Sequence, residues 1–263
     1  MANFEQQLHL AVRNGDREKI EKLLDKGVDV NCLFYGWTPL QLALQKGYEA
    51  VALLLIDRGC DVHLHDKNSV SPFEECLRKN LTKVLTKVLN KGEDVNAVLS
   101  NGEPPICEAV KNANRELVSV FIKVGKCNVN TVGCNEESPL FTAARSGYSD
   151  ICRLLLDAGA DSDFVHPSNQ HTPLITTASN DNDDVIKVLL KHGCNVNHRD
   201  VIGKSALWHA YSNSNTDSMK LLLRAGADKN LLNSEGQTIL DDAKDADDDD
   251  VIELLTKFNQ SWT

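Results

Sequence analysis

The sequence is poor in aromatic residues and lacks the cysteine patterns of disulfide or zinc proteins. Phe, Trp and Tyr make up 5% of its 263 residues, and there are only 2 Met and 7 Pro. The 8 Cys form no C-x-x-C pair and no closely spaced framework, so we expect free thiols in a reducing compartment. No apolar run reaches the roughly 18 residues of a membrane span. The N-terminus has neither the basic nor the apolar region of a signal peptide. We therefore expect a soluble protein of the cytoplasm or nucleus, with no membrane partner.

Positive charge is scarce in the second half of the chain. Residues 1–132 carry 17 Lys and Arg against 17 Asp and Glu, whereas residues 133–263 carry 11 against 21. The whole net charge of −10 therefore lies in the second half. This balance disfavours bulk binding to nucleic acid, although it does not exclude a local basic site.

A short motif recurs seven times, at steps of 33 or 34 residues. Its copies are WTPLQLA from Trp37, VSPFEEC from Val70, EPPICEA from Glu103, ESPLFTA from Glu137, HTPLITT from His171, KSALWHA from Lys204 and QTILDDA from Gln237. An aliphatic segment such as VALLLIDRG or ICRLLLDAG follows each copy, and most units close with a turn similar to D/N-V-N. A degenerate eighth unit opens the chain. Repetition at this period predicts tandem helical units that bury their apolar faces against one another.

This pattern resembles the ankyrin repeat, whose T-P-L-H-x-A motif has a period of about 33 residues. The resemblance covers Phe4 to Phe258 and implies an all-α repeat solenoid. Each repeat would contain a helix-turn-helix and a β-hairpin or loop, and the solenoid would curve around a concave face. We expect one domain over residues 1–263, with an N-terminal capping repeat at 4–31, repeats at 35–66, 68–100, 101–134, 135–166, 169–200 and 202–234, and a C-terminal capping repeat at 235–258.

Helix-capping residues occur where such units need them. The Thr or Ser of the motif suits the N-cap of a first helix, and the following Pro suits its first turn. A left-handed Gly is expected to end each second helix, at Gly27, Gly59, Gly92, Gly125, Gly159, Gly193 and Gly226. Four stretches depart from the pattern: LRKNLTK and VKNANRE lack the usual Gly between helices, and GKCNVN and FVHPSNQ each carry one extra residue. They indicate either tolerated loop variation or a reshaped binding face.

Motifs of enzymes and of metal sites are absent. The sequence has no G-x-x-x-x-G-K-[ST] loop, no G-x-S-x-G elbow and no H-E-x-x-H helix. We expect no enzyme activity, no cofactor and no metal. His63, His65, Cys194 and His198 have suitable residue types, but the repeat register puts the first two three or four units from the others. The acidic residues 247–250 precede VIELL and fit a helix N-terminus better than a calcium loop.

The ends of the first helices are basic in the first five units. Family resemblance implies that these ends and the hairpin tips line the face that holds partners. The cations are Arg13, Lys46, Arg78, Lys79, Lys111 and Arg145, whereas the last three units are neutral or acidic there. We interpret the basic series as a surface for acidic groups. The alternative is that these cations only complement helix dipoles in solvent.

The hairpin before the first full motif is aromatic, whereas its equivalents are polar. Phe34 and Tyr35 occupy its tip, and Trp37 directly precedes the Thr of the motif. Exposed Trp and Tyr beside basic residues are typical of interface hot spots. The alternative is that the rings fold back over the small N-terminal repeat and shield its core. Trp208, in the slot of the motif's usual His, is expected in the core.

These features favour a non-catalytic scaffold for protein–protein interaction. It would bind an extended or loop segment of a partner that carries an apolar anchor and acidic or phosphorylated groups. The predicted partner-binding residues are Phe34, Tyr35, Trp37, Lys46, Lys67, Arg78, Lys79, Lys111 and Arg145.

Two other functions stay open. GWTPL followed by KNSVSPF resembles the ankyrin part of the oligoadenylate-activated antiviral ribonucleases, which implies base stacking at Trp37 and a phosphate contact at Lys67. Against such a nucleotide sensor, Glu103 stands where that resemblance calls for another aromatic residue. The third hypothesis is that the chain recognises substrates as part of a larger adaptor such as a ubiquitin ligase.

Overall fold

The computed structural model describes residues 4–65, 70–180 and 182–258, which form sixteen α-helices in pairs and one π-helix. The first helices of the pairs are α1 (Phe4–Asn14), α3 (Pro39–Lys46), α5 (Pro72–Arg78), α7 (Pro105–Lys111), α9 (Pro139–Arg145), α11 (Pro173–Ser179), α13 (Ala206–Ser212) and α15 (Ile239–Asp245). The second helices are α2 (Arg17–Asp25), α4 (Glu49–Asp57), α6 (Thr82–Asn90), α8 (Arg115–Val120), α10 (Ser149–Asp157), α12 (Asp183–Lys191), α14 (Thr216–Arg224) and α16 (Asp249–Lys257). The π-helix η1 (Phe121–Gly125) continues α8. This order confirms the predicted all-helical repeat architecture.

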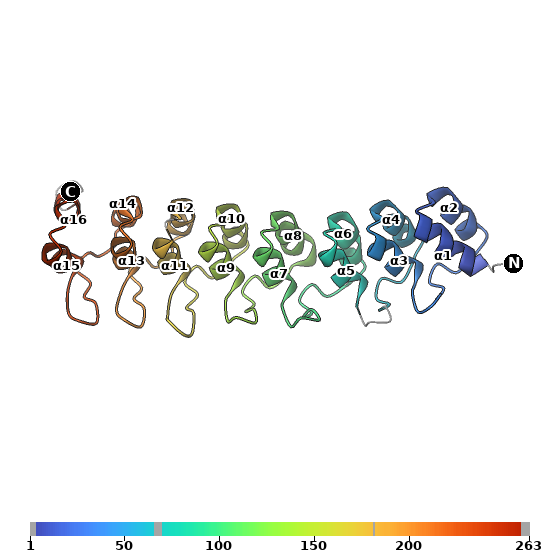
Figure 1. Ribbon diagram of the computed structural model, residues 1–263, viewed down its shortest axis with the longest axis horizontal. Coiled ribbons are helices and arrows are strands. Elements are labelled where there is room, and N and C mark those ends of the chain that lie inside the picture. Colours follow the sequence, from blue (N-terminus) through green and yellow to red (C-terminus); the bar gives the residue numbers. More distant parts are fainter. Residues whose placement is uncertain (1–3, 66–69, 181, 259–263) are drawn as a thin grey trace. The chain divides into compact units, whose positions relative to one another are not determined.

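The chain divides into two compact units. The first comprises the described residues of Met1–Pro105 and Ser119–Cys127, and the second those of Ile106–Val118 and Asn128–Thr263. In the first unit α3 packs on α1 and α5, and α4 packs on α6. In the second unit α11 packs on α9 and α13, and α12 packs on α10 and α14. Within each unit the hairpin loops extend from the side of the first helices (Figure 1).

Most first helices begin with the predicted cap. The Thr38 hydroxyl accepts a hydrogen bond from Gln41 N at 3.2 Å, and the Gln41 side chain accepts one from Thr38 N at 2.9 Å, with Pro39 in the first turn. This reciprocal capping box satisfies two amides that the helix cannot pair internally. The cap hydroxyl makes the same contact at Ser71, Ser138, Thr172 and Thr238. Ser205 makes no side-chain cap hydrogen bond, so α13 begins without this contact.

The ends of the second helices follow the prediction except at Gly125. The glycines with positive φ are Gly27, Gly59, Gly92, Gly159, Gly193 and Gly226. Gly125 was wrongly predicted to be left-handed, because the extra residue of GKCNVN widens the last turn into η1. Lys126 takes the left-handed conformation instead, with φ 52°, and its amide donates to Phe121 O. Gly125 itself packs so closely on Val95 that a Cβ would lie 2.8 Å from a Val95 methyl carbon.

The turns that lack Gly between their helices keep the same backbone. Asn80 and Ala113 have φ of 54° and 53°, in the position that Gly15, Gly47 and Gly147 occupy in other pairs. Asn tolerates this region, whereas Ala carries a steric penalty of about 1–2 kcal/mol. The tertiary packing of the repeat therefore fixes the turn, whatever residue stands there.

Side-chain amides link the turns of adjacent repeats. Asn31 Oδ1 accepts a hydrogen bond from Asp61 N at 2.8 Å in the first unit. In the second unit Asn130 accepts one from Asp161 N at 2.8 Å. These contacts satisfy backbone amides that no helix pairs, so the Asn of the D/N-V-N turn has a structural role.

Buried thiols and a buried indole complete the core. None of the eight Cys forms a disulfide, and six of them are buried. Burial raises the pKa of the thiol to about 12 for Cys60, Cys76, Cys152 and Cys194, so these groups stay protonated and unreactive at neutral pH. Trp208 is 1% exposed and its Nε1 donates to Leu231 O at 3.2 Å, which confirms its predicted place in the core. None of the helices in the described residues is long and apolar enough to cross a membrane.

Candidate partner-binding site

The aromatic hairpin is a two-residue turn between Phe34 and Trp37. Phe34 N donates to Trp37 O at 3.0 Å, and Trp37 N donates back to Phe34 O at 3.2 Å. The two turn residues, Tyr35 and Gly36, have φ of 52° and 77°. Two positive φ values in sequence define a type I′ turn, for which Asn-Gly is the preferred pair. Tyr35 thus occupies a position that usually carries Asn, Asp or Gly.

Later hairpins pair across four positions, in those that open at Leu99, Gly133, Asp200 and Asn233. Asp200 N donates to Lys204 O across four positions, and Asp200 Oδ1 accepts from Ile202 N and Lys204 N at 3.0 and 2.9 Å. Asn233 holds the next hairpin in the same way. The position equivalent to Asp200 in the aromatic hairpin is Leu33, which cannot accept these bonds. That oxygen is not required for the longer pairing, because Leu99 N and Gly133 N donate to Glu103 O and Glu137 O across the same four positions without it.

The aromatic side chains divide into a packed ring and an exposed ring. Phe34 is half-buried, with its centroid 5.5 Å from His9 and 4.4 Å from Tyr35. His9 is buried and donates from Nε2 to Cys32 O at 3.0 Å. Burial lowers the pKa of His9, so its ring is neutral and packs as an aromatic group. Phe34 therefore covers part of the N-terminal repeat, as the alternative interpretation expected, whereas Tyr35 is 86% exposed.

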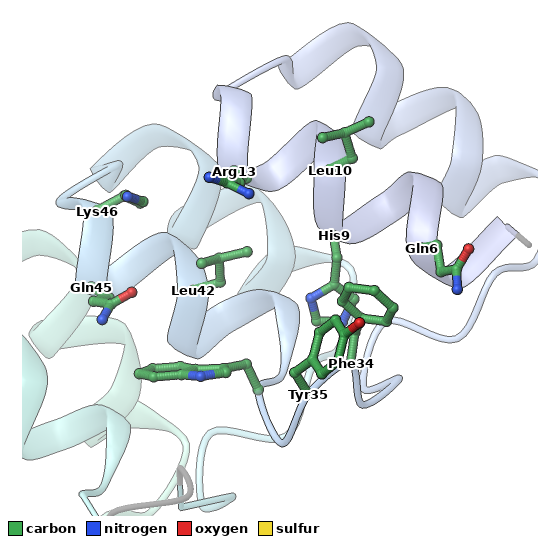
Figure 2. Close-up of a pocket in the computed structure, with 10 residues that line it drawn as sticks. Gln6, His9, Leu10, Arg13, Phe34, Tyr35, Leu42, Gln45 and Lys46 are labelled. Atoms are coloured by element: carbon green, nitrogen blue, oxygen red, sulfur yellow. The ribbon is translucent and has the colours of Figure 1, made fainter. Parts of the chain in front are cut away.

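A cavity of about 560 Å³ opens between α1, α3 and the aromatic hairpin. Its wall is formed by Gln6, His9, Leu10, Arg13, Phe34, Tyr35, Trp37, Leu42, Gln45 and Lys46. Figure 2 shows Leu10 and Arg13 on α1, Leu42 and Lys46 on α3, and the ring of Phe34 beside His9. We call this cavity the aromatic pocket. Its volume and mixed lining suit one or two side chains of a ligand.

A second, smaller cavity shares one wall with the aromatic pocket. It has a volume of about 190 Å³ and lies between Trp37 and α5, where Val70, Pro72 and Arg78 line it. Trp37 is half-buried and borders both cavities. Gln45 also borders both, so a ligand that extends from one cavity to the other would pass over Trp37 and Gln45.

The cations around these cavities differ in how their charge is compensated. Arg13 and Lys46 are exposed, and neither forms an ion pair with another described residue. Arg78 instead pairs with Glu74 at 2.8 Å and donates to Ser100 Oγ at 3.3 Å. Among the cations that line the two cavities, Arg13 and Lys46 are therefore open to a ligand, whereas Arg78 already pairs with Glu74.

The remaining predicted residues fall outside the aromatic pocket. Lys79 is exposed at the end of α5 in the first unit, and Lys111 ends α7 in the second unit. Arg145, also in the second unit, pairs with Glu137 at 3.0 Å. Lys67 lies outside the described residues. The structure thus brings Phe34, Tyr35, Trp37 and Lys46 together and leaves the other predicted cations elsewhere.

Two leucines of the pocket wall were missed from the sequence, and one of them had left a signal. Leu42 stands four residues after the cap Thr, a position that is polar in every other copy of the motif: Glu75, Glu108, Thr142, Thr176, His209 and Asp242. An apolar residue in this one slot, beside an aromatic hairpin, indicates an apolar surface. Leu10 is 50% exposed on α1, and the degenerate first unit gives no register that would have identified it.

Comparison with known proteins agrees with this repeat architecture. Residues 3–66, 73–166 and 159–233 match the family described as ankyrin repeats in three copies. The chain belongs to the ankyrin repeat family. The crystal structure of the ankyrin repeat domain of Bcl-3, a member of the IkappaB family, aligns with a TM-score of 0.60 and 22% identity over 89% of this chain and 92% of that one. At this identity the likeness confirms the fold alone.

Relatives of similar sequence match only part of the chain. The 2-5A-dependent ribonuclease of Mus musculus is 42% identical over 65 residues, 24% of this ankyrin chain and 9% of the relative. The ankyrin repeat protein YahD of Escherichia coli (strain K12) is 31% identical over 122 residues, 46% and 60% of the two chains. "Ankyrin repeat, SAM and basic leucine zipper domain-containing protein 1" of Dasypus novemcinctus is 28% identical over 120 residues, which cover 44% of this chain and 25% of the relative. The matches thus span less than two thirds of each relative. Ankyrin repeats are typically non-catalytic and generally bind other proteins.

Proposed function

We propose that this ankyrin chain is a non-catalytic recognition scaffold whose aromatic pocket holds an apolar side chain from an extended or loop segment of another protein. The observation that carries the proposal is Tyr35, which is 86% exposed and has φ 52°. A bulky residue in the left-handed region costs about 1–2 kcal/mol. Because its ring is exposed, little burial offsets that cost. Binding a ligand is a use for the ring that folding does not supply.

The charges of the pocket favour acidic groups beside the apolar anchor. Arg13 and Lys46 are exposed cations at the pocket and lack ion pairs among the described residues. Carboxylates or phosphates of a partner would form charge-assisted hydrogen bonds with them. From there the segment would pass over Trp37 toward Arg78. Lys67 and Lys79 in the first unit, and Lys111 and Arg145 in the second, are proposed as further contacts for acidic groups.

Selection of peptides from a random display library tests the proposal without assuming a natural partner. The selected peptides should combine an aromatic or large aliphatic residue with neighbouring Asp or Glu. Trp37→Ala should weaken binding of such a peptide by about 2 kcal/mol, or about 30-fold, while the circular dichroism spectrum stays unchanged. Val98→Ala is the matched control, because it removes an exposed apolar residue (63% exposed) from another hairpin of the first unit. Equal affinity of the Trp37 variant and the wild type would refute the anchor.

Nucleotide binding in the same pocket is the second candidate. It is supported by the 42% identity over 65 residues with a protein named 2-5A-dependent ribonuclease, and by the combination of Trp37 with nearby cations. Stacking on an aromatic ring plus phosphate contacts is the chemistry that single strands require. A thermal-shift screen with 2′-5′-linked and 3′-5′-linked adenylates distinguishes the candidates, since only a bound nucleotide raises the melting temperature. The adenylate must also displace the selected peptide if both use the pocket.

A third version of the proposal makes the chain one part of a larger adaptor. The chain spans less than two thirds of the length of the three relatives. In a larger adaptor such as a ubiquitin ligase, the aromatic pocket would then hold a segment of the substrate. The peptide consensus from the selection serves this version of the proposal equally, because it defines the ligand chemistry and not the attached domains.

A further inference from the structure

Three metal-ligating side chains meet in the second unit, in a place that the protein-binding proposal does not use. His171 directly precedes the cap residue of α11, Asp200 opens the next hairpin, and His209 lies on α13. Their ligand atoms all lie within 4.8 Å of one another. His209 Nε2 lies 2.7 Å and His171 Nε2 lies 3.4 Å from Asp200 Oδ2. One carboxylate oxygen is thus shared by two imidazoles from adjacent repeats.

Backbone amides hold the carboxylate in a fixed orientation. Asp200 Oδ1 accepts hydrogen bonds from Ile202 N and Lys204 N, and this leaves Oδ2 directed at the two imidazoles. The side chain of Asp200 is 1% exposed, whereas those of His171 and His209 are 22% and 15% exposed. A ligand fixed by second-shell hydrogen bonds, beside partly open imidazoles, combines preorganisation with access for an ion.

No lysine or arginine side chain neutralises this buried carboxylate within the described residues. Its ion-pair contacts there are the two imidazoles. The equivalent of His171 in the preceding repeat, Glu137, instead pairs with Arg145 at 3.0 Å. A buried anion is stable only when a cation or several hydrogen bonds compensate it. Hydrogen bonds from two amides and contacts with two imidazoles compensate Asp200, so a bound dication would not have to displace a Lys or Arg side chain from it.

We propose that His171, Asp200 and His209 form a binding site for a first-row transition-metal dication, with Zn²⁺ as the best-suited ion. Two imidazole nitrogens and one carboxylate oxygen are typical zinc ligands, at about 2.0–2.2 Å from the ion. Two such ligands of a tetrahedral ion lie about 3.4 Å apart. The His171–Asp200 separation of 3.4 Å matches this value, whereas the His209–Asp200 separation of 2.7 Å would widen on binding the ion. Three protein ligands leave one position for water or for a group from a partner. The bound ion would tie the residue before α11 to α13 within the second unit.

Cobalt substitution tests this site and distinguishes it from the eight thiols of the chain. Reduced protein is freed of metal with a chelator and titrated with Co²⁺, which reports its ligands through its absorption spectrum. The expected result is one Co²⁺ per chain, with the d–d bands of a four- or five-coordinate nitrogen–oxygen site and no thiolate charge-transfer band. Zn²⁺ should displace the cobalt and raise the melting temperature of the protein. A thiolate band at the first equivalent would refute the assignment, as would the absence of binding.

Ligand variants complete the test. His171→Gln and His209→Gln should each weaken Zn²⁺ binding by at least about tenfold in a competition assay with a coloured chelator. The matched control is His192→Gln, which removes an imidazole of the second unit that pairs with Asp157 at 3.1 Å. Circular dichroism verifies that each variant is folded. The site is refuted if His192→Gln weakens binding as much as His171→Gln and His209→Gln do. It is also refuted if His171→Gln and His209→Gln leave the affinity for Zn²⁺ unchanged. These outcomes are independent of peptide binding at the aromatic pocket.

Discussion

The backbones of Phe34 and Trp37 exchange two hydrogen bonds across a turn of only two residues. In later hairpins the pairing spans four or five residues, as between His166 N and His171 O. The aromatic residues and the shorter turn are therefore parts of one local change. The shorter turn presents Tyr35 at its tip, with positive φ at both Tyr35 and Gly36. That change builds one wall of the aromatic pocket.

Replacing Tyr35 with Asn should stabilise the protein and weaken its binding. Asn is favoured at the first position of a type I′ turn, so Tyr35→Asn should raise the free energy of unfolding by about 0.5–1 kcal/mol. Urea denaturation measures this gain. The affinity for a selected peptide should fall in the same variant, because the exposed ring is lost. Tyr35→Phe is the control that keeps the ring and the strain. A Tyr35→Asn variant that is less stable than wild type would contradict the turn assignment.

Replacing Ala113 with Gly should stabilise the second unit. Ala113 has φ 53° in the turn between α7 and α8. Gly relieves a penalty of about 1–2 kcal/mol but loses part of that gain to the entropy of the unfolded chain, so we expect a net gain of about 0.5–1 kcal/mol. Asn80→Gly is the matched control at the same turn of the first unit, where Asn already tolerates the conformation and the gain should be smaller. Equal gains at the two positions would show that strain at Ala113 is not the cause.

Protonation of His9 should destabilise the protein below neutral pH. Burial lowers the pKa of His9 in the folded chain, against the opposing effects of Cys32 O and Glu5, whereas an unfolded His titrates near about 6.5. The folded state therefore binds fewer protons. The free energy of unfolding therefore has its full value above pH of about 6.5, and it falls as the pH is lowered toward the pKa of His9 in the folded chain. His9→Gln should reduce the loss of unfolding free energy between pH 7 and pH 5.

Denaturation of His65→Gln at the same two pH values is the control for His9. His65 is exposed in a hairpin of the same unit, so its removal should leave the loss unchanged. His171 also has a lowered pKa, so some loss should persist in the His9 variant. A His9→Gln variant with the full loss seen in the wild type would show that His9 does not contribute.

The fold was predictable from the sequence because repetition averages out local exceptions. Seven copies of one motif fixed the helix pairs, and the caps at Thr38 and Ser138 were deduced from single residues. The backbone at Gly125 was not predictable, since an inserted residue can be absorbed in a loop or in a helix, and packing against Val95 decides which. The contact that decides the backbone at Gly125 thus comes from a residue far away in sequence, Val95.

The candidate sites were only partly predictable, for a related reason. Aromatic residues in one hairpin stood out against six siblings, and this contrast identified Tyr35 and Trp37. The same contrast did not reveal that Glu74 compensates Arg78, because a carboxylate near a cation is common in any sequence. The cluster of His171, Asp200 and His209 was also missed. Its residues come from two adjacent repeats. The repeat register shows that these repeats are neighbours, but the hairpin geometry is needed to place the three side chains together.

Compensation of Arg78 by Glu74 predicts unequal roles for the cations of the first unit. Arg13→Ala combined with Lys46→Ala should weaken binding of an acidic peptide by about 1 kcal/mol, or about fivefold, since these charges are open to a ligand. The affinity of this double variant should also change less with salt concentration than that of the wild type. Arg78→Ala should change the affinity little, because its guanidinium already pairs with Glu74 at 2.8 Å. Glu74→Gln provides the reciprocal test. It removes the closer of the two carboxylates that pair with Arg78, at 2.8 Å against 3.9 Å for Glu75, and should increase both the affinity and its salt dependence. If Arg78→Ala weakens binding more than the double variant does, the acidic groups of the ligand lie at α5, and the smaller cavity rather than the aromatic pocket anchors them.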